Sequence, residues 1–221
     1  GGYPAALYAA KNNLKVALIE EDKIGGTCLN RGCIPTKTFV QSASTYRNIK
    51  EAGVFGLSAG EMNFDWTKIV ENKKRVVKEL NSGVKGLLRK SGVTVYEGRG
   101  SLLDEHRVKV EGKQETELTA DSFILATGST PAKLPVPGTD LDGVINSNHA
   151  LDFDALPKSL VIVGGGVIGV EFAYVFNTFN VEVTIIEMLP EILANQDKDV
   201  TTLATEVLTE YGVKVHTAAS L

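Results

Sequence analysis

Cysteine is scarce in this sequence of 221 residues, which holds only Cys28 and Cys33, five positions apart. So few cysteines exclude the disulfide scaffold of a small secreted protein. A close pair in an otherwise cysteine-poor chain instead indicates redox or reactive-thiol chemistry. Zinc usually takes four ligands, and the sequence offers no second cysteine or cysteine–histidine pair, so no metal site is predicted.

Long apolar runs are also missing. None approaches the roughly 20 residues needed to span a bilayer, and no targeting pattern is visible. The formal charge of −4 argues against nucleic acid, which would require a clustered basic face. A hydrophobic share of 43% and a charged share of 23% are ordinary for a globular protein. We therefore expect a soluble, cytoplasmic protein whose partners include neither nucleic acid nor membrane.

An initiator methionine is absent as well. The chain opens at Gly1-Gly2 and stops at Leu221, just after a segment at 213–216 that reads as a strand. We interpret the sequence as a piece of a longer polypeptide.

Strand and helix patterns alternate along the chain. An alanine-rich helix begins at Gly2 and precedes a continuous apolar strand at 15–20, which is half of a βαβ unit. Helical periodicity covers 66–90, and the prolines and glycines of 128–143 indicate a crossover or linker. Further strands are expected at 93–97, 107–111, 122–127, 160–163 and 181–187.

The run Gly-Gly-Gly-Val-Ile-Gly at 164–169 follows one of these strands and opens a helix. Gly164 would permit a tight turn, Gly166 would let the backbone approach a pyrophosphate, and Gly169 would let helix and strand pack closely. Glu187 ends the next strand, where an acid can accept hydrogen bonds from a ribose 2′-OH. No Arg or Lys follows within ten residues to suit a 2′-phosphate, so NAD is favoured over NADP. The alternative is a merely structural turn.

Gly1-Gly2 fits the tail of a similar motif, with Gly2 as its third glycine and Glu20 placed to meet a second ribose. Simple helix packing is the alternative. Together the patterns predict an α/β protein with two Rossmann-like nucleotide-binding units, both incomplete. Residues 1–150 would form the first, lacking its N-terminal strand, and 151–221 the truncated start of the second.

The cysteines lie in a run that we expect to form a glycine-rich loop over 25–33, with a helix beginning near Cys33 and Pro35 in its first turn. On one straight helix the two cysteines would be too far apart for a disulfide, whose Cα atoms lie about 4.4–6.8 Å apart. Gly32 can relax the backbone and let them meet. The helix dipole and Lys37 would lower a thiol pKa. A structural disulfide or two inert buried thiols are the alternatives.

The full run at 25–37, Gly-Gly-Thr-Cys-Leu-Asn-Arg-Gly-Cys-Ile-Pro-Thr-Lys, resembles the active-site signature of the pyridine nucleotide–disulfide oxidoreductases. The residues at three positions of the run, Leu29, Ile34 and Thr36, most resemble those of the dihydrolipoamide dehydrogenase branch of that family. The run Ala-Thr-Gly-Ser at 126–129 resembles the exit of its flavin domain.

The stretch at 160–187 resembles the NAD domain of the same family, which has FAD/NAD(P)-binding folds of the three-layer ββα type. The resemblance thus covers essentially the whole chain, in order.

The resemblance implies roles for individual residues. Cys28 would exchange with lipoamide sulfur, and Cys33 would be the thiolate beside the flavin. Lys37 would lie near the flavin, paired with Glu171. Electrons would pass from dihydrolipoamide through the disulfide and FAD to NAD+. The implied cofactor-binding residues are Gly2, Glu20, Gly26, Thr27, Lys37, Ala126, Thr127, Gly128, Gly164, Gly166, Gly169 and Glu187.

The resemblance also implies binding partners, and it leaves alternative functions open. The intact protein would be a homodimer that acts on lipoamide carried by an acyltransferase or a glycine-cleavage carrier protein. Glutathione reductase-like and mercuric reductase-like members share the cysteine loop, and an inert nucleotide-binding fragment is the non-enzymatic alternative.

The chain departs from the family in two respects. The family's acid–base, a His paired with Glu, comes from a C-terminal domain of the partner subunit. None of His106, His149 and His216 stands in the expected His-Pro setting, so each is interpreted as a surface histidine and the piece itself is expected to be inactive. Arg31 stands where many relatives have Val.

Overall fold

The computed structural model describes residues 1–113 and 115–220, and its contacts divide the chain into two compact units. Unit 1 comprises Gly1–Pro35 and Lys74–Thr130, and unit 2 comprises Thr36–Lys73 and Pro131–Leu221. This division differs from the domain boundary predicted at 150/151, because helices α3 (Cys33–Lys50) and α4 (Trp66–Lys90) each contribute residues to both units. The boundary at 150/151 stays a prediction about the two nucleotide-binding domains.

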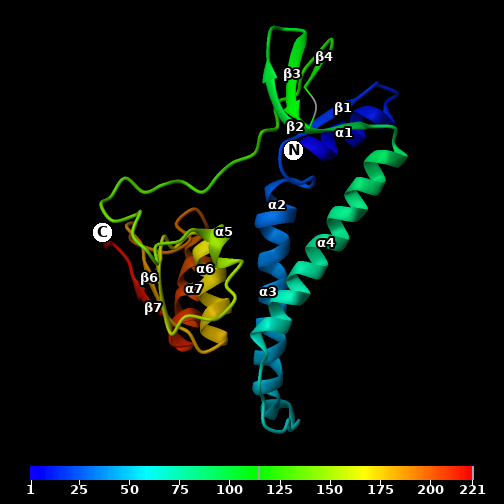
Figure 1. Cartoon of the computed structure of the whole chain (residues 1–221). Helices are drawn as coiled ribbons and strands as arrows, with labels where there is room; N and C mark the ends of the chain where they lie inside the picture. The colour runs from blue at the N-terminus through cyan, green and yellow to red at the C-terminus, as the bar shows by residue number, and fades with distance from the viewer. Residues whose placement is uncertain (114, 221) are drawn as a thin grey trace. The chain divides into compact units, whose positions relative to one another are not determined.

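Unit 1 contains a four-stranded sheet in the order β1-β2-β3-β4 (Figure 1). Strand β1 (Ala17–Glu20) runs parallel to the first half of β2 (Thr94–Leu102), with Glu20 opposite Glu97. From Gly98 onward β2 pairs instead with β3 (Arg107–Gly112), antiparallel, and β3 pairs with β4 (Thr116–Thr119). Helix α1 (Gly2–Lys11), α2 (Gly26–Arg31) and the later part of α4 supply the helical layer.

The core of unit 1 is small and apolar. It joins Ala6 of α1, Leu29 of α2 and Val84 and Leu88 of α4 to residues beside the sheet. Leu80 and Leu87, which share the apolar periodicity of α4, are instead exposed. The periodicity therefore predicted the helix correctly but not which of its leucines are buried.

Unit 2 contains the parallel sheet β5-β6-β7, formed by β5 (Ser159–Val163), β6 (Glu182–Ile186) and β7 (Lys214–His216). Helix α6 (Val167–Thr178) connects β5 to β6, and α7 (Lys198–Glu210) connects β6 to β7 (Figure 1). The βα alternation predicted from the sequence is confirmed here. The unit also holds η1 (Ala52–Phe55) and α5 (Ser147–Ala150).

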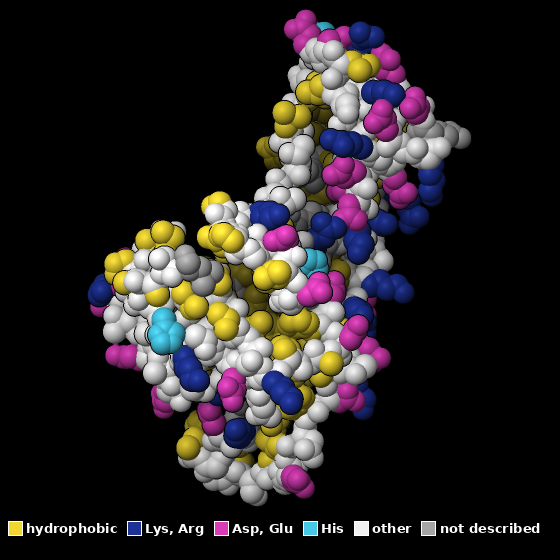
Figure 2. Space-filling view, turned by 60° about the vertical axis from the view of Figure 1, so that its left-hand side comes forward, with side chains coloured by type: hydrophobic (Ala, Val, Ile, Leu, Met, Phe, Trp, Pro, Cys, Tyr) yellow, Lys and Arg dark blue, Asp and Glu magenta, His cyan; other side chains and the backbone are white. Residues whose placement is uncertain are grey.

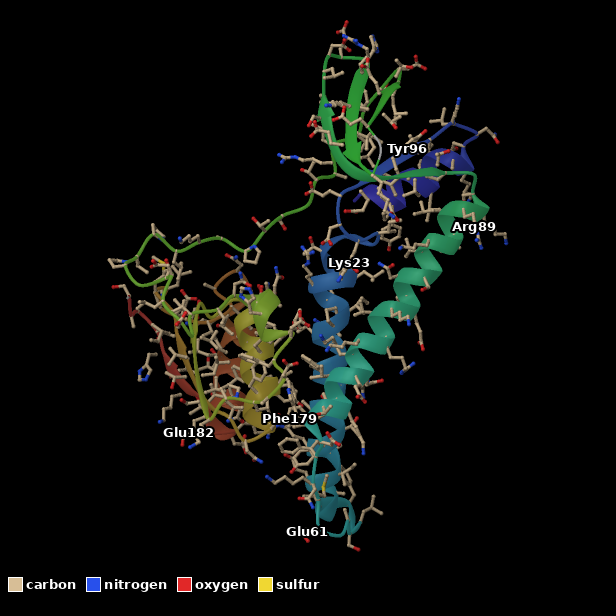
Figure 3. All side chains as sticks on the ribbon, in the orientation of Figure 1. Lys23, Glu61, Arg89, Tyr96, Phe179 and Glu182 are labelled. Carbon is tan, nitrogen blue, oxygen red and sulfur yellow. The ribbon has the colours of Figure 1, made fainter. Side chains whose placement is uncertain are left out.

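Aromatic side chains dominate the core of unit 2. The ring of Phe179, labelled in Figure 3, lies 5.0 Å from that of Phe64 and 5.7 Å from that of Trp66, centroid to centroid. Phe176 and Phe39, both fully buried, extend this cluster along α6 and α3. Aromatic contacts of this kind add to the free energy of simple burial, so the cluster is the main anchor of α6.

Two of the predicted elements are wrong. Residues 122–127 form no strand, and Ile124 and Leu125 are each 72% exposed, because the described chain gives this segment no hydrogen-bonded neighbour. The expected loop at 25–33 is in fact helix α2 up to Arg31, followed by Gly32. Periodicity alone cannot reveal either outcome, since both depend on contacts with distant segments.

Candidate functional site

The two cysteines lie on either side of a break between two helices. Cys28 is in α2, Cys33 is the first residue of α3, and Gly32 between them has φ −133° and ψ −116°. A Cβ on Gly32 would lie 3.1 Å from both the Cα of Cys28 and the carbonyl oxygen of Thr27. The absence of a side chain therefore lets the end of α2 turn back tightly, which brings the two thiols within hydrogen-bonding reach of each other.

Both thiols are free and exposed. The hydrogen bond with Cys33, followed by desolvation, raises the pKa of Cys28, although the backbone N–H groups of Cys33 and Ile34 act in the opposite direction. The backbone at the start of α3 therefore does lower the pKa of Cys28, as predicted, but the neighbouring thiol of Cys33 raises it by more. A proton held between two sulfurs is easier to keep than one on an isolated thiol at a helix N-terminus.

Lys37 and Glu171 form an ion pair between α3 and α6. The lysine side chain is 57% exposed and the glutamate 22%, so solvent screens the pair and its contribution to stability is small. Lys37 lies one helical turn after Cys33 on α3. The pairing implied by the family resemblance is present, whereas the roles of these residues remain proposals.

Four of the residues predicted to bind the flavin, Gly2, Thr27, Ala126 and Gly128, form two contacts within unit 1. Gly1 and Gly2 lie against Ala126, since a Cβ on either would be 3.5–3.6 Å from the Cβ of Ala126. Gly128, in the left-handed region at φ +76°, lies beside Thr27, whose Oγ1 would be 3.6 Å from a Cβ at that glycine. The start of α1, the first turn of α2 and the segment after β4 are thus lined by small residues, which suits the approach of a phosphate-bearing group to the backbone.

Glu20 ends β1 in a half-buried position. Its Oε1 accepts a hydrogen bond of 3.0 Å from the backbone N–H of Asp22. Desolvation and the neighbouring Glu21 raise its pKa. Its carboxylate thus lies at the carboxyl end of a parallel strand, the edge at which α/β sheets bind nucleotides.

The second glycine turn has the geometry that a dinucleotide cradle needs. Gly164 has φ +110°, and a Cβ on Gly169 would lie 2.1 Å from the carbonyl oxygen of Gly164, so only glycine permits α6 to approach the strand this closely. At Gly166, the N-cap of α6, nothing lies within 4 Å of the Cβ position. The helix start therefore offers open backbone and a positive dipole end to an anion.

Glu187 ties this turn to the end of β6. Its Oε2 accepts a 2.6 Å hydrogen bond from the N–H of Gly165, and its Oε1 accepts a 2.8 Å bond from the N–H of Leu189. The sequence pattern did not single out Gly165. Glycine is nevertheless required there, because a Cβ would lie 2.5 Å from the side chain of Ile192. The carboxylate is thus fixed beside the glycine turn.

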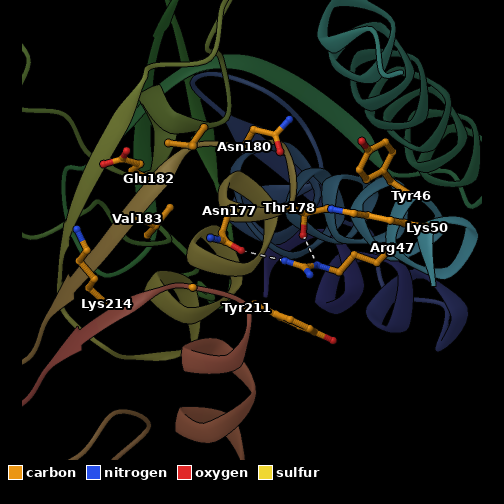
Figure 4. A pocket seen from close by; sticks show the side chains of 12 residues that line it. Tyr46, Arg47, Lys50, Asn177, Thr178, Asn180, Glu182, Val183, Tyr211 and Lys214 are labelled. Carbon is orange, nitrogen blue, oxygen red and sulfur yellow. Dashed lines mark hydrogen bonds between the residues drawn. The ribbon is translucent and has the colours of Figure 1, made fainter. Parts of the chain in front are cut away.

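A pocket of about 540 Å³ in unit 2 contains none of the predicted site residues (Figure 4). Its central side chain, Arg47, donates to Thr178 Oγ1 at 2.6 Å and to Asn177 Oδ1 at 2.9 Å, and stacks 3.6 Å from the ring centroid of Tyr211. Because these contacts occupy the guanidinium, Arg47 joins α3 to α6 and α7. We interpret the pocket as a structural junction.

Among the residues that the structure describes, no group of three or more His, Cys, Asp and Glu side chains is placed to hold a metal ion. None of the described helices combines the length and the apolar character that a membrane span requires. His106, His149 and His216 are exposed, as predicted. On the face drawn in Figure 2, acidic and basic side chains are interspersed.

Curated relatives resemble the chain over its whole length. It is 46% identical to a dihydrolipoyl dehydrogenase of Acholeplasma laidlawii over 226 residues, which cover 100% of this chain and 66% of that protein. It is 43% identical to dihydrolipoyl dehydrogenase of Bacillus subtilis, again over 100% of this chain but 49% of that protein. The chain therefore spans about half to two thirds of the length of these relatives.

Solved structures agree with this relationship. LpdA from Mycobacterium tuberculosis superposes with a TM-score of 0.89 at 30% identity, covering 99% of this chain and 49% of that one. The HOCl-induced flavoprotein disulfide reductase RclA from Escherichia coli gives a TM-score of 0.84 at 31% identity, covering 99% and 47%. These neighbours confirm the predicted Rossmann-like α/β fold class.

The model of one protein family matches residues 1–221, and its description is "Pyridine nucleotide-disulphide oxidoreductase". The family description names a pyridine nucleotide, and RclA is described as a flavoprotein, in agreement with the NAD and FAD predicted from the sequence. With the cysteine pair, the glycine cradle and the matching relatives all in place, the chain belongs to the pyridine nucleotide-disulphide oxidoreductase family.

Proposed function

We propose that this chain carries the redox-active half of a dihydrolipoamide dehydrogenase, which oxidises dihydrolipoamide to lipoamide and reduces NAD+. The observation that carries the proposal is the junction at Gly32, which brings Cys28 and Cys33 together with both thiols exposed. The similarity to dihydrolipoyl dehydrogenases over the whole chain supports this substrate.

The thiol chemistry begins from the oxidised pair. A thiolate of dihydrolipoamide attacks the sulfur of Cys28, the Cys28–Cys33 bond breaks, and Cys33 leaves as a thiolate. The second substrate sulfur then attacks the first, which closes the lipoamide ring and releases Cys28. Two electrons have moved from substrate to protein. Of the two substrate protons, one is released to solvent when the attacking thiolate forms, and the other passes to Cys28, where the hydrogen bond with Cys33 holds it.

The residues described above fit the two cofactors. Gly2, Thr27 and Gly128 would face FAD, with Lys37 near the ring system and Glu20 at a ribose. Gly164, Gly166 and the start of α6 would hold the NAD pyrophosphate, and Glu187 its ribose. When bound, FAD supplies the two-electron link between the dithiol and the nicotinamide.

The choice of NAD over NADP is supported by Glu187. Its buried carboxylate lies beside the glycine cradle, where a 2′-phosphate would meet a like charge. No Arg or Lys occurs in the ten residues after it to compensate for that charge.

The partners proposed for the whole protein follow from the same assignment. Lipoamide would arrive on the swinging arm of an acyltransferase or on a glycine-cleavage carrier protein, in the cytoplasm. The whole protein would be a homodimer, since the acid–base pair that the family uses is supplied by a second subunit.

The experiment uses the 221-residue chain itself. The chain is oxidised until mass spectrometry shows the loss of two hydrogens, and it is then treated with dihydrolipoamide under anaerobic conditions. We expect two new alkylatable thiols and one lipoamide per chain. With Cys33→Ser, lipoamide should form a mixed disulfide at Cys28, whereas with Cys28→Ser any adduct at Cys33 should form far more slowly.

Glutathione at equal thiol concentration serves as the competing reductant. Reduction by glutathione as fast as by dihydrolipoamide would favour a glutathione-type member of the family. A chain that never forms the intramolecular disulfide, or that ignores both reductants, would contradict the proposed function and favour an inert nucleotide-binding fragment.

A further inference from the structure

A side chain from a distant part of the sequence reaches the segment before the cysteine pair. Asn81 of α4 donates through Nδ2 to the carbonyl oxygen of Ile24 and to Oδ1 of Asn30, the latter at 3.2 Å. Asn81 is half-buried, and all these residues belong to unit 1. The sequence motif includes Asn30 but gives no signal for Asn81, which is 51 residues further along the chain.

Asn30 lies between the two cysteines and binds the chain that leads into α2. Its Nδ2 donates to the carbonyl oxygens of Lys23, Ile24 and Gly26 at 3.2, 3.1 and 3.0 Å. Lys23, just before α2, is labelled in Figure 3. One amide therefore joins the body of α2 to the turn before it, and Asn81 fixes that amide from the opposite side.

Leu29, the neighbour of Cys28, is held by the same face of α4. It is 6% exposed and belongs to a cluster with Val84 and Leu88, which are 7% and 0% exposed. Because Asn81, Val84 and Leu88 are three and seven residues apart, they lie on one face of the helix. That face contacts both residues that follow Cys28.

Helix α2 cannot hold this geometry alone. It has six residues, far fewer than the roughly 12–15 that an isolated helix needs to be even marginally stable in water. Its N-cap, Gly25, makes no side-chain capping hydrogen bond. Its orientation therefore depends on tertiary contacts, among which are those from α4.

We propose that Asn81 is a positioning residue for the Cys28–Cys33 redox pair. By fixing Asn30 and the carbonyl of Ile24, it holds α2 in the orientation that keeps the two sulfurs close and so raises their effective concentration. This role rests on the proposed function only in requiring that the pair cycles between disulfide and dithiol.

The test measures the thiol–disulfide equilibrium of the 221-residue chain in glutathione redox buffers, quantified by alkylation and mass spectrometry. For Asn81→Leu we expect the equilibrium constant for disulfide formation to fall about tenfold, equivalent to about 30 mV. Asn48→Leu, the same substitution at an exposed position of α3, is the control for the substitution itself and should match the wild type.

The same equilibrium measured in concentrated urea separates positioning from any change in intrinsic thiol chemistry. There the wild type and Asn81→Leu should agree, since no helix remains to hold α2. Far-UV circular dichroism verifies that each variant is folded, and Asn81→Ser replaces Asn81→Leu if the latter does not fold.

The outcomes distinguish the two proposals. A folded Asn81 variant whose equilibrium stays within twofold of the wild type would overturn the role of Asn81 while leaving the redox pair intact. A wild-type chain that forms no disulfide in any glutathione buffer would overturn the proposed function instead. A tenfold loss in buffer that disappears in urea supports the inference.

Discussion

The two glycine-rich turns of this chain use glycine in opposite ways. At the cysteine turn, Gly32 is crowded by the backbone of Thr27 and Cys28, and the missing side chain serves to bring two sulfurs together. At the turn that opens α6, Gly166 faces empty space, and the missing side chain leaves room for a ligand. Glycine therefore marks a close approach of protein to protein in one case and open space at a helix start in the other, where we propose that the dinucleotide binds.

The second turn contains both kinds of glycine, the crowded Gly169 and the open Gly166, three residues apart. Substitution of Gly169 should cause the largest loss of stability. Gly169→Ala places a Cβ 2.1 Å from the carbonyl oxygen of Gly164, so α6 must move away from the strand. We expect the free energy of unfolding to fall by about 3 kcal/mol, as for severe overpacking. Trp66, the only tryptophan and part of the unit 2 core, reports the urea transition by fluorescence.

Gly166→Ala is the matched variant, because its methyl group meets nothing within 4 Å. Its unfolding free energy should change by no more than about 1 kcal/mol, the scale of an N-cap substitution. The affinity for NAD+, measured by calorimetry, should nevertheless fall about tenfold or more, which corresponds to about 1.4 kcal/mol. Equal losses of stability in the two variants would remove the distinction between packing glycine and cradle glycine.

A smaller effect is expected at the cysteine turn. Gly32→Ala introduces contacts of 3.1 Å rather than 2.1 Å, which a slight opening of the α2–α3 junction can relieve. We expect a loss of about 1 kcal/mol in stability. The same opening should make disulfide formation about fivefold less favourable in glutathione buffers. An unchanged thiol–disulfide equilibrium would show that Gly32 does not control the approach of the sulfurs.

The smallest effect is a pH dependence. The pKa of Cys28 is raised in the folded chain, chiefly by the hydrogen bond with Cys33. The resulting stabilisation is complete below the ordinary thiol pKa and is lost as the pH rises through the raised value. The urea midpoint of the reduced wild type should thus fall more between neutral and alkaline pH than that of Cys33→Ala.

Alkylation rates test the same hydrogen bond from the side of reactivity. In Cys33→Ala the Cys28 thiolate should appear at lower pH than in the reduced wild type, since its largest pKa-raising contact is gone. Identical pH profiles for Cys28 in the two proteins would contradict the sulfur–sulfur hydrogen bond.

Much of the fold could be predicted from local pattern. The helix at 66–90, the helix start at Cys33 and the three parallel strands of unit 2 all appear where periodicity and glycine placement indicated them. Helix α2 was missed because glycine-rich sequence favours a loop, and here Leu29 and Asn30 are fixed by α4. The expected strand at 122–127 failed because a strand requires a hydrogen-bonded neighbour as well as an apolar sequence.

The sequence by itself determined the chemistry: two cysteines around a glycine, and a glycine turn followed by an acid, are short-range patterns with a physical meaning at fixed spacing. Only the tertiary structure decided the direction in which the pKa of Cys28 moves and which residues hold it in place. The reason is distance along the chain, because Asn81 and Ile24 are separated by 57 residues and meet only when α4 packs against α2. Contacts of that kind leave no periodic trace in the sequence.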